Sequence, residues 1–289
     1  MTLELVDKAA DWRSRLDACR GKGQQVGLVP TMGALHAGHM SLIRRAAGEC
    51  DVVAITDYVN PLQFGAGDDL GAYPRDLERD CELAEEAGAS YVFAPTVEEM
   101  WPEPSATTVS VTGLTETLEG SSRPGHFDGV TTIVAKLFSL TGRCAAYFGE
   151  KDYQQLVVVR RLITDLSLPV DLVACPTVRE TDGLALSSRN GYLTAEERTA
   201  APELYYALLA GKRAVEDDGI DDPDLVEKSM AESLSRQRLF ELDYSAVVDP
   251  ETFERPRRIA GEVRLLIAAR IGRARLIDNV PATPPSAAS

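Results

Sequence analysis

The sequence predicts an α/β protein, with a Rossmann-like parallel sheet domain followed by a smaller α+β C-terminal domain. Short apolar strands alternate with amphipathic helices over the first 177 residues, which is typical of βαβ units around a parallel sheet. Polar turns follow several of these strands, at the edge where parallel sheets bind ligands. After residue 177 the order changes to helices followed by short strands, which indicates a separate antiparallel unit.

The elements of the first part follow from apolar spacing and from glycine or proline at their ends. We expect an amphipathic helix over residues 3–20, ended by Gly21 and Gly23. Residues 107–111 alternate, which is typical of an edge strand or hairpin arm. The expected strands are 25–29, 51–59, 90–93, 145–148 and 170–174, and the expected helices are 40–47, 76–87, 130–140 and 153–166.

The second part contains fewer apolar runs and more charged helical faces. Thr194 is a good N-cap for a helix that we expect to reach Asp217, with two glutamates in its first turn. A second helix is expected over 224–237, and strands over 243–248, 263–269 and 274–277. We therefore predict domains at 1–177 and 178–280, the second a lid, and a disordered tail at 281–289.

Composition narrows the function classes. The 289 residues carry a net charge of −15, with a pI near 4.7, which argues against nucleic acid as a partner. No apolar run approaches the ~20 residues of a membrane span. Five scattered cysteines, with no Cys-x-x-Cys, and an N-terminus without basic or apolar signal regions favour a cytoplasmic protein.

The most informative stretch is Val-Pro-Thr-Met-Gly-Ala-Leu-His-Ala-Gly-His at residues 29–39. It places His36 and His39 where a strand gives way to a helix, with Gly33 and Gly38 allowing close approach of a ligand. Backbone N–H groups at a helix start favour anions, and imidazoles there can donate to phosphate. Helix capping or packing is the simpler alternative, and zinc binding has weak support because no further His or Cys is near.

His-x-Gly-His after Pro-Thr-Met-Gly-Ala-Leu resembles the signature of the HIGH-type nucleotidyltransferases. Within that superfamily the chain is similar to the pantoate–β-alanine ligases, because Gly-Glu-Lys-Asp-Tyr-Gln-Gln-Leu at 149–156 and Ser-Ser-Arg-Asn at 187–190 also match. The resemblance implies two steps: ATP and pantoate give pantoyl adenylate and pyrophosphate, then β-alanine displaces AMP. It also implies Mg²⁺ and a homodimer.

Two alternatives stay open. One is a related adenylate-forming amide ligase that acts on a different hydroxy acid or amine. The other is a nucleotide-binding module without catalysis, which the full set of expected catalytic residues disfavours. Pyrophosphate release with a panel of acids separates the three hypotheses.

The resemblance also implies roles for individual residues. His39 matches the family's proton donor, and the expected catalytic residues are His36, His39, Lys151, Ser187 and Arg189. We expect the loop over residues 179–190 to close over bound ATP. The expected ATP-binding residues are Met32, Gly33, His36, Gly38, His39, Gly149, Lys151, Asp152, Val178, Leu186, Ser187, Ser188 and Arg189.

Pantoate and β-alanine are expected at the glutamines Gln63 and Gln155, which are neutral hydrogen-bonding groups suited to a hydroxy acid. Asn60, His126 and Tyr58 would complete that wall, and Asp80 matches a position linked to the metal. Structural alternatives exist for several of these residues: a surface lysine for Lys151, a polar interdomain loop for 187–189, and helix caps for Asp152 and His126.

Several positions depart from the pattern of the family that the chain resembles, among them Leu186, Tyr58 and Asp57. Leu186 stands where Met is common, a nearly isosteric change. Tyr58 replaces Phe, so a hydroxyl faces the expected apolar wall of the pantoate pocket. Asp57 stands where Ile is common, and a carboxylate in a central strand needs a partner. We expect that partner to be an arginine under the sheet or a group at a subunit contact.

Overall fold

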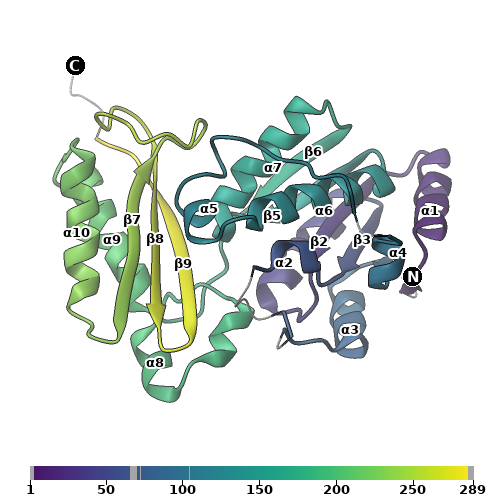
Figure 1. The fold of residues 1–289 in the computed structure, drawn as a ribbon, viewed down its shortest axis with the longest axis horizontal. Coiled ribbons are helices and arrows are strands. Elements are labelled where there is room, and N and C mark those ends of the chain that lie inside the picture. The colour runs from purple at the N-terminus through teal and green to yellow at the C-terminus, as the bar shows by residue number, and fades with distance from the viewer. Residues whose placement is uncertain (1–2, 66–69, 72, 104, 286–289) are drawn as a thin grey trace. The chain divides into compact units, whose positions relative to one another are not determined.

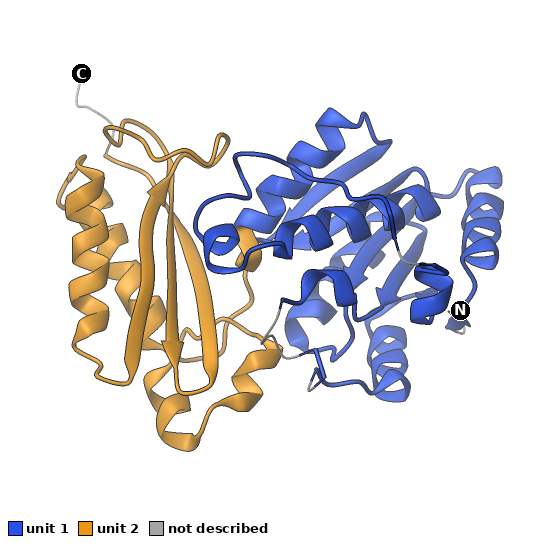
Figure 2. Cartoon of the chain, in the orientation of Figure 1, with its two compact units in different colours: residues 1–150, 154–176 blue, residues 151–153, 177–289 orange. Residues whose placement is uncertain are grey.

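The computed structural model describes residues 3–65, 70–71, 73–103 and 105–285. Two compact units divide the chain (Figure 2). The first contains Met1–Glu150 and Gln154–Pro176, and the second contains Lys151–Tyr153 and Thr177–Ser289. The short segment Lys151–Tyr153 belongs to the second unit, although in sequence it follows a strand of the first unit and precedes the rest of a helix of that unit. The sequence pattern did not predict this assignment.

The first unit is built on a six-stranded parallel sheet (Figure 1), which confirms the Rossmann-like prediction. Its order is β1-β4-β3-β2-β5-β6, so the chain moves to one side of β2 through β3 and β4, and to the other side through β5 and β6. The carboxyl ends of β2 and β5 therefore flank the switch point of the sheet. The strands are β1 (Glu4–Val6), β2 (Val26–Thr31), β3 (Val52–Asp57), β4 (Tyr91–Phe93), β5 (Cys144–Gly149) and β6 (Val170–Cys175).

Helices connect these strands, and apolar side chains between helices and sheet form the core. Trp12 of the first helix is fully buried and stacks on Phe93 at 5.0 Å between ring centroids. The helices are α1 (Ala9–Gly21), α2 (Ala37–Glu49), α3 (Leu77–Ala87), α4 (Val97–Met100), α5 (Glu119–Ser122), α6 (His126–Thr141) and α7 (Tyr153–Asp165), with 3₁₀ turns η1 (Pro61–Gln63) and η2 (Glu150–Asp152).

Two predictions for this unit are wrong. Residues 4–6 form the edge strand β1 instead of the first turn of a helix, because they pair with β4 in parallel register. Residues 107–111 form no strand. Their backbone is satisfied by threonines of α6: Val109 N donates to Thr132 Oγ1 at 3.0 Å, and Val109 O accepts from Thr131 Oγ1.

The second unit is an α+β structure, as predicted. The three strands are antiparallel in the order β7 (Phe240–Val248), β8 (Val263–Ile271) and β9 (Ala274–Ala282). Helices α9 (Glu203–Glu216) and α10 (Pro223–Ser235) pack on this sheet around a core that includes Leu204, Leu208, Leu265 and Ile267. The unit also contains η3 (Ser188–Tyr192) and α8 (Ala195–Ala200).

Two boundaries in this unit differ from prediction. The helix expected from Thr194 to Asp217 is two helices, because Pro202 separates α8 from α9. Thr194 does cap α8, in a reciprocal box with Glu197. The expectation of a disordered tail from residue 281 is wrong for residues 281–282, which belong to β9, and residues 286–289 lie outside the described residues. No described helix has the length and apolarity needed to cross a bilayer.

Candidate active site

The two histidines of residues 29–39 cap the helix that follows β2. His36 is the N-cap of α2, and its Nδ1 accepts from the backbone N of Gly38 at 3.1 Å. His39, three residues on, accepts at Nδ1 from the backbone N of His36 at 3.4 Å. The rings lie 4.1 Å apart between centroids. Both imidazoles therefore complete a capping box, which was the simpler alternative at the level of sequence.

This arrangement also fixes which ring nitrogen carries the proton. A neutral imidazole that accepts at Nδ1 has its hydrogen on Nε2. His36 and His39 thus each present an N–H donor at Nε2, at the start of a helix whose backbone favours anions. Capping and phosphate binding are compatible here, because they use opposite nitrogens of each ring.

Asp80 holds the loop between β2 and α2. Its Oδ2 accepts from Ala34 N and its Oδ1 from Leu35 N, both at 2.7 Å, and the side chain is buried. Gly33 and Ala34 both adopt left-handed backbone conformations, at φ 79° and 52°. Those conformations are costly for alanine, so the two hydrogen bonds from α3 stabilise a strained turn. The metal role expected for Asp80 stays a prediction.

Asp57, at the end of β3, lies beside Asp80. A Cβ added to Gly33 would meet Asp57 Oδ1 at 2.4 Å and Asp80 Oδ2 at 3.0 Å, so the two carboxyl groups share the space under that glycine. Burial, the charge of Asp80 and a hydrogen bond to it raise the pKa of Asp57 to about 7. The group beside Asp57 is a second carboxylate, that of Asp80, so the arginine expected under the sheet is wrong, whereas a partner at a subunit contact stays a prediction. Asp57 and Asp80 are 23 residues apart in sequence, and only the packing of α3 on β3 brings them together.

An amide cluster formed by Met32, Asn60, Gln63 and His126 lies next to this loop. Gln63 Nε2 donates to Met32 Sδ at 3.0 Å, and its Oε1 accepts from Asn60 Nδ2 at 3.2 Å. His126 Nδ1 donates to the Gln63 carbonyl at 2.8 Å, and its Nε2 accepts from Arg123 at 3.0 Å. These four residues were predicted from separate sequence motifs, and the structure brings them into one hydrogen-bonded group. His126 uses both ring nitrogens within the unit, which favours a structural role, although not the helix cap expected as an alternative, because Gly125 is the N-cap of α6.

The amide cluster depends on Gly129 in α6. Its carbonyl accepts from Asn60 Nδ2 at 3.1 Å. A Cβ at this position would lie 2.2 Å from the carbonyl oxygen of Leu62 and 2.5 Å from Cα of Gln63. The helix and η1 thus approach backbone to backbone, which a side chain would prevent.

Tyr58 follows β3, and its side chain is buried. Its hydroxyl makes no hydrogen bond to any of the described residues, and the same holds for the indole Nε1 of Trp101. Burial raises the pKa of Tyr58 to about 12, and the indole of Trp101 lowers it in part. No backbone carbonyl among the described residues accepts from this hydroxyl.

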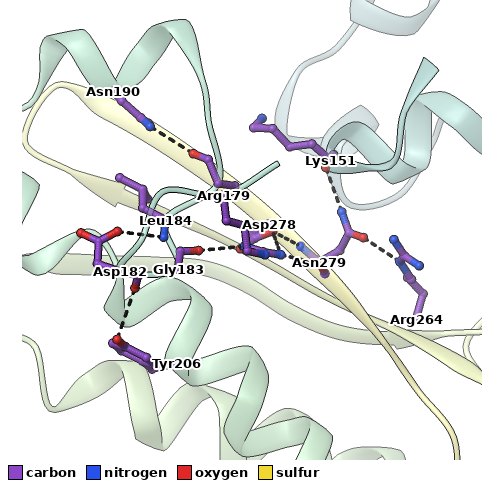
Figure 3. A network of polar contacts seen from close by, with 11 residues as sticks. Lys151, Arg179, Asp182, Gly183, Leu184, Asn190, Tyr206, Arg264, Asp278 and Asn279 are labelled. Carbon is purple, nitrogen blue, oxygen red and sulfur yellow. Dashed lines mark hydrogen bonds and ion pairs between the residues drawn. The ribbon is translucent and has the colours of Figure 1, made fainter. Parts of the chain in front are cut away.

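In the second unit, the side chain of Asn279, in β9, binds the backbone of Lys151 (Figure 3). Asn279 Nδ2 donates to the Lys151 carbonyl at 2.8 Å, and Lys151 Nζ lies 3.6 Å from Asp152 Oδ1. Lys151 is half-buried and Asp152 is exposed. No sequence signal pointed to Asn279, since an asparagine in a strand has no recognisable spacing to a lysine so far away.

The segment expected to be a long loop, residues 179–190, is held by hydrogen bonds within itself and to neighbouring residues of the second unit. Arg179 forms a two-pronged ion pair with Asp278, at 2.6 and 3.0 Å, and donates to Gly183 O at 3.1 Å (Figure 3). Leu186 N donates to Val178 O at 2.9 Å. Ser187 caps η3 by accepting from Arg189 N at 3.2 Å. Ser187, Ser188 and Arg189 are all half-buried at the start of this turn.

The remaining predicted residues occupy simple positions. Gly149 ends β5, and nothing within 4 Å opposes a Cβ there. Gln155 is half-buried on α7. Its neighbour Gln154 is buried and structural: it donates to the carbonyls of Leu114 and Thr117 and accepts from Glu119 N.

These observations define a class of protein. An anion-accepting helix start follows β2 and the Gly149 turn follows β5, at the switch point where parallel sheets bind nucleotides. Among the described residues, no group of three or more His, Cys, Asp or Glu is placed to hold a metal ion. The first unit therefore has the architecture of nucleotide-binding α/β proteins, and the residues described in it form no metal cage.

Comparison with known proteins gives the family. A profile of the pantoate-beta-alanine ligase family matches residues 4–281. The pantothenate synthetase of Moorella thermoacetica is 49% identical over 278 residues, covering 96% of this chain and 98% of that protein, and the one from Brucella canis is 48% identical, covering 96% and 94%. The chain belongs to the pantoate-beta-alanine ligase family and is a ligase.

Solved structures agree with this assignment. Pantothenate synthetase from Thermus thermophilus superposes with a TM-score of 0.90 at 50% identity, covering 96% of this chain and 98% of that one. Pantoate-beta-alanine ligase from Francisella tularensis, complexed with beta-gamma ATP and beta-alanine, gives a TM-score of 0.80 at 32% identity, covering 96% and 97%. The enzyme thus performs the ATP-dependent condensation of pantoate with β-alanine.

Proposed function

We propose that the reaction passes through a pantoyl adenylate, with the capped histidine pair as the phosphate-binding group. A pantoate carboxylate oxygen attacks the α-phosphorus of ATP, and the bond to the β-phosphate oxygen breaks to release pyrophosphate. The β-alanine amine then attacks the acyl carbon, the C–O bond to AMP breaks, and the nitrogen loses a proton. The first step needs stabilisation of negative charge more than covalent chemistry.

The observation that carries this proposal is the use of Nδ1 of both histidines in the helix cap. Their Nε2–H groups are then fixed as donors at the first turn of α2. Donors held in place before the reaction stabilise developing charge without reorganising. We assign His39 as the proton donor and His36 to the phosphates.

The second unit supplies further cationic and polar groups. We assign Lys151, Ser187, Ser188 and Arg189 to the phosphates. Asp152 is assigned to the ribose, together with Gly149 of the first unit. The backbone of Val178 is assigned to the adenine. Val178 lies opposite Leu186, at the base of the short hairpin that Arg179 and Ala185 form by antiparallel pairing. We propose that the second unit acts as a lid, since the residues it carries match the family's phosphate-binding positions.

The amide cluster is the proposed site for pantoate and β-alanine. Gln63 and Asn60 present neutral amides, which suit a hydroxyl and a carboxylate together, and His126 orients Gln63 through its carbonyl. Gln155 is assigned to the same substrate, and Tyr58 to its apolar wall. Met32 contacts Gln63 and joins this cluster to the histidine loop.

Magnesium enters the proposal as part of the nucleotide. Both oxygens of Asp80 already accept backbone N–H groups, and the described residues form no metal cage. Mg²⁺ prefers to keep water and phosphate oxygens, so it arrives with ATP and is held mainly by its phosphates. We also propose a cytoplasmic homodimer; a monomeric mass in light scattering would contradict the dimer.

The test is pyrophosphate release with ATP, Mg²⁺ and pantoate, followed by AMP release when β-alanine is added. We expect pyrophosphate without β-alanine, because adenylation precedes the amine. Release with another hydroxy acid but not with pantoate would favour a specialised relative. No release with any acid would leave only a nucleotide-binding module.

A further inference from the structure

Asn279 is a buried side-chain amide with both ends bound (Figure 3). The residue is only 2% exposed. Its Oδ1 accepts from Arg264 Nε at 2.6 Å, and its Nδ2 donates to the carbonyl of Lys151 at 2.8 Å. Because Arg264 has no acceptor atom, it must face the oxygen of the amide, and the NH₂ group is then turned toward Lys151. Arg264 therefore selects the orientation of Asn279.

The segment Lys151–Tyr153 is held at a second point by the same arginine. The guanidinium of Arg264 lies 4.2 Å from the centre of the Tyr153 ring, and Tyr153 Oη donates to the carbonyl of Pro250 at 3.1 Å. The three-residue segment is thus fixed at its first residue by Asn279 and at its last by Arg264 and Pro250. The Lys151 side chain extends away from Asn279, so Asn279 holds only the backbone of Lys151 (Figure 3).

We propose that Asn279 is a positioning residue for Lys151: it fixes the lysine backbone on β9, so that the ammonium group meets the phosphates from one place. This rests on the phosphate-binding role proposed for Lys151. A lysine side chain is flexible, and its charge is well placed only if its Cα is fixed. Displacement of a charged group by about 1 Å can cost roughly 10²-fold in rate.

Asn279→Asp tests this with the smallest change. The isosteric carboxylate keeps an acceptor for Arg264 but removes the donor to the Lys151 carbonyl and opposes that oxygen with a negative charge. We expect kcat for pyrophosphate release to fall at least tenfold, with the urea midpoint of the variant recorded alongside. Lys212→Ala is the matched control, since it removes another side-chain donor to a backbone carbonyl, that of Pro281 at 3.0 Å. Its kcat should stay within twofold of the wild type.

The decisive readout is the same substitution in a Lys151→Ala background. If Asn279 acts through Lys151, Asn279→Asp should lower kcat less than twofold once the ammonium group is gone. An equal loss in both backgrounds would show a general structural effect and overturn the inference. Normal kcat for Asn279→Asp alone would also overturn it.

A second variant covers the case in which Asn279→Asp does not fold. Arg264→Lys keeps the charge but changes the bond that orients the Asn279 amide, so we expect a smaller loss in kcat that again disappears in the Lys151→Ala background. An additive loss contradicts the inference. If Lys151→Ala itself has near-normal activity, the proposed role of Lys151 fails, which is a different outcome from failure of Asn279 alone.

Discussion

Asp57 Oδ1 and Asp80 Oδ2 meet beneath Gly33, so two carboxyl groups from different elements share one buried space under the histidine loop. Two like charges at such a position repel, and one proton on Asp57 removes the repulsion. Asp80 itself holds the loop by accepting from the backbone N–H groups of Ala34 and Leu35. Asp57 thus acts on the loop through its neighbour.

The first prediction concerns stability and pH. The native state keeps the Asp57 proton up to a pKa of about 7, whereas the unfolded chain releases it near 3.8. Native protein therefore binds more protons between these values, and the contribution of Asp57 to stability falls as pH rises from about 4 to 7. Asp57→Ile should gain stability relative to wild type at pH 8, and less at pH 5, by at most about 1.4 kcal/mol per pH unit.

Urea unfolding at pH 5 and pH 8 measures this difference, and Asp57→Asn serves as an isosteric control without a titrating proton. Its stability should follow that of Asp57→Ile with pH. The same stability difference from wild type at both pH values would show that the pair does not share a proton. Pyrophosphate release by both variants should change less than stability.

The second prediction tests the proposed catalytic groups. His39→Ala and Lys151→Ala should each lower pyrophosphate release by roughly 10²–10³-fold, the scale for loss of one preorganised donor. The thermal midpoint of Lys151→Ala should change little, because Asn279 holds only its backbone. His39→Ala also removes a cap contact, so a modest drop in its midpoint is expected. Near-full release by either variant would remove that residue from the mechanism.

The third prediction concerns Tyr58→Phe. Its hydroxyl is buried without a hydrogen bond to the described residues, so its removal should leave stability unchanged or higher. We expect kcat/KM for pantoate to change less than tenfold, within ~1.4 kcal/mol. Tyr147→Phe is the contrast, since that hydroxyl donates to Glu49 at 2.9 Å and its loss should cost about 0.5–1.5 kcal/mol. A preference for another hydroxy acid, reversed by Tyr58→Phe, would be the opposite result.

The fourth prediction concerns Gly129→Ala. The added methyl would overlap the backbone of Leu62 and Gln63, so α6 and η1 must separate. We expect a loss of about 1–3 kcal/mol or more in urea unfolding and a raised KM for pantoate. Gly48→Ala, in α2 with open space at Cβ, should instead stabilise by about 0.5–1 kcal/mol. Similar effects of both substitutions would contradict the close backbone approach.

The fifth prediction concerns the segment 179–190. If it closes over nucleotide, limited proteolysis there should be slower with ATP and Mg²⁺ than without. Arg179→Lys, which loses the two-pronged pair with Asp278, should be cut faster in both conditions. Equal cleavage of the wild type with and without ATP and Mg²⁺ would count against closure.

Much of this fold could be predicted from local pattern. Gly88 at φ 100° ends α3, and Thr194 begins α8, as their residue types indicate. Apolar runs located the inner strands. The segment 4–6 was missed because three residues are too short for a period, and its strand pairing comes from β4, far along the chain.

Sequence motifs predicted the candidate site residues, but not the residues that hold them in place. His36, Gln63 and Lys151 lie within recognisable stretches, whereas Asn279 and Asp57 acquire meaning only from their neighbours in space. From the sequence, Asp57 was expected to pair with an arginine, because an isolated carboxylate in a central strand needs an opposite charge or a hydrogen-bond donor. Its actual neighbour is a second carboxylate, and the shared proton that makes this possible leaves no mark on the sequence.

The cap of α2 also selects the chemical state of the two rings. A proton on Nδ1 of His36 or His39 would remove an acceptor from the first turn, and a ring flipped by 180° would point carbon at a backbone N–H. Either change loosens the helix start. A neutral ring with its only hydrogen on Nδ1 would offer no N–H at Nε2, and the fold disfavours that tautomer. The cap of α2 therefore selects the tautomer in which both rings donate at Nε2, before any nucleotide arrives.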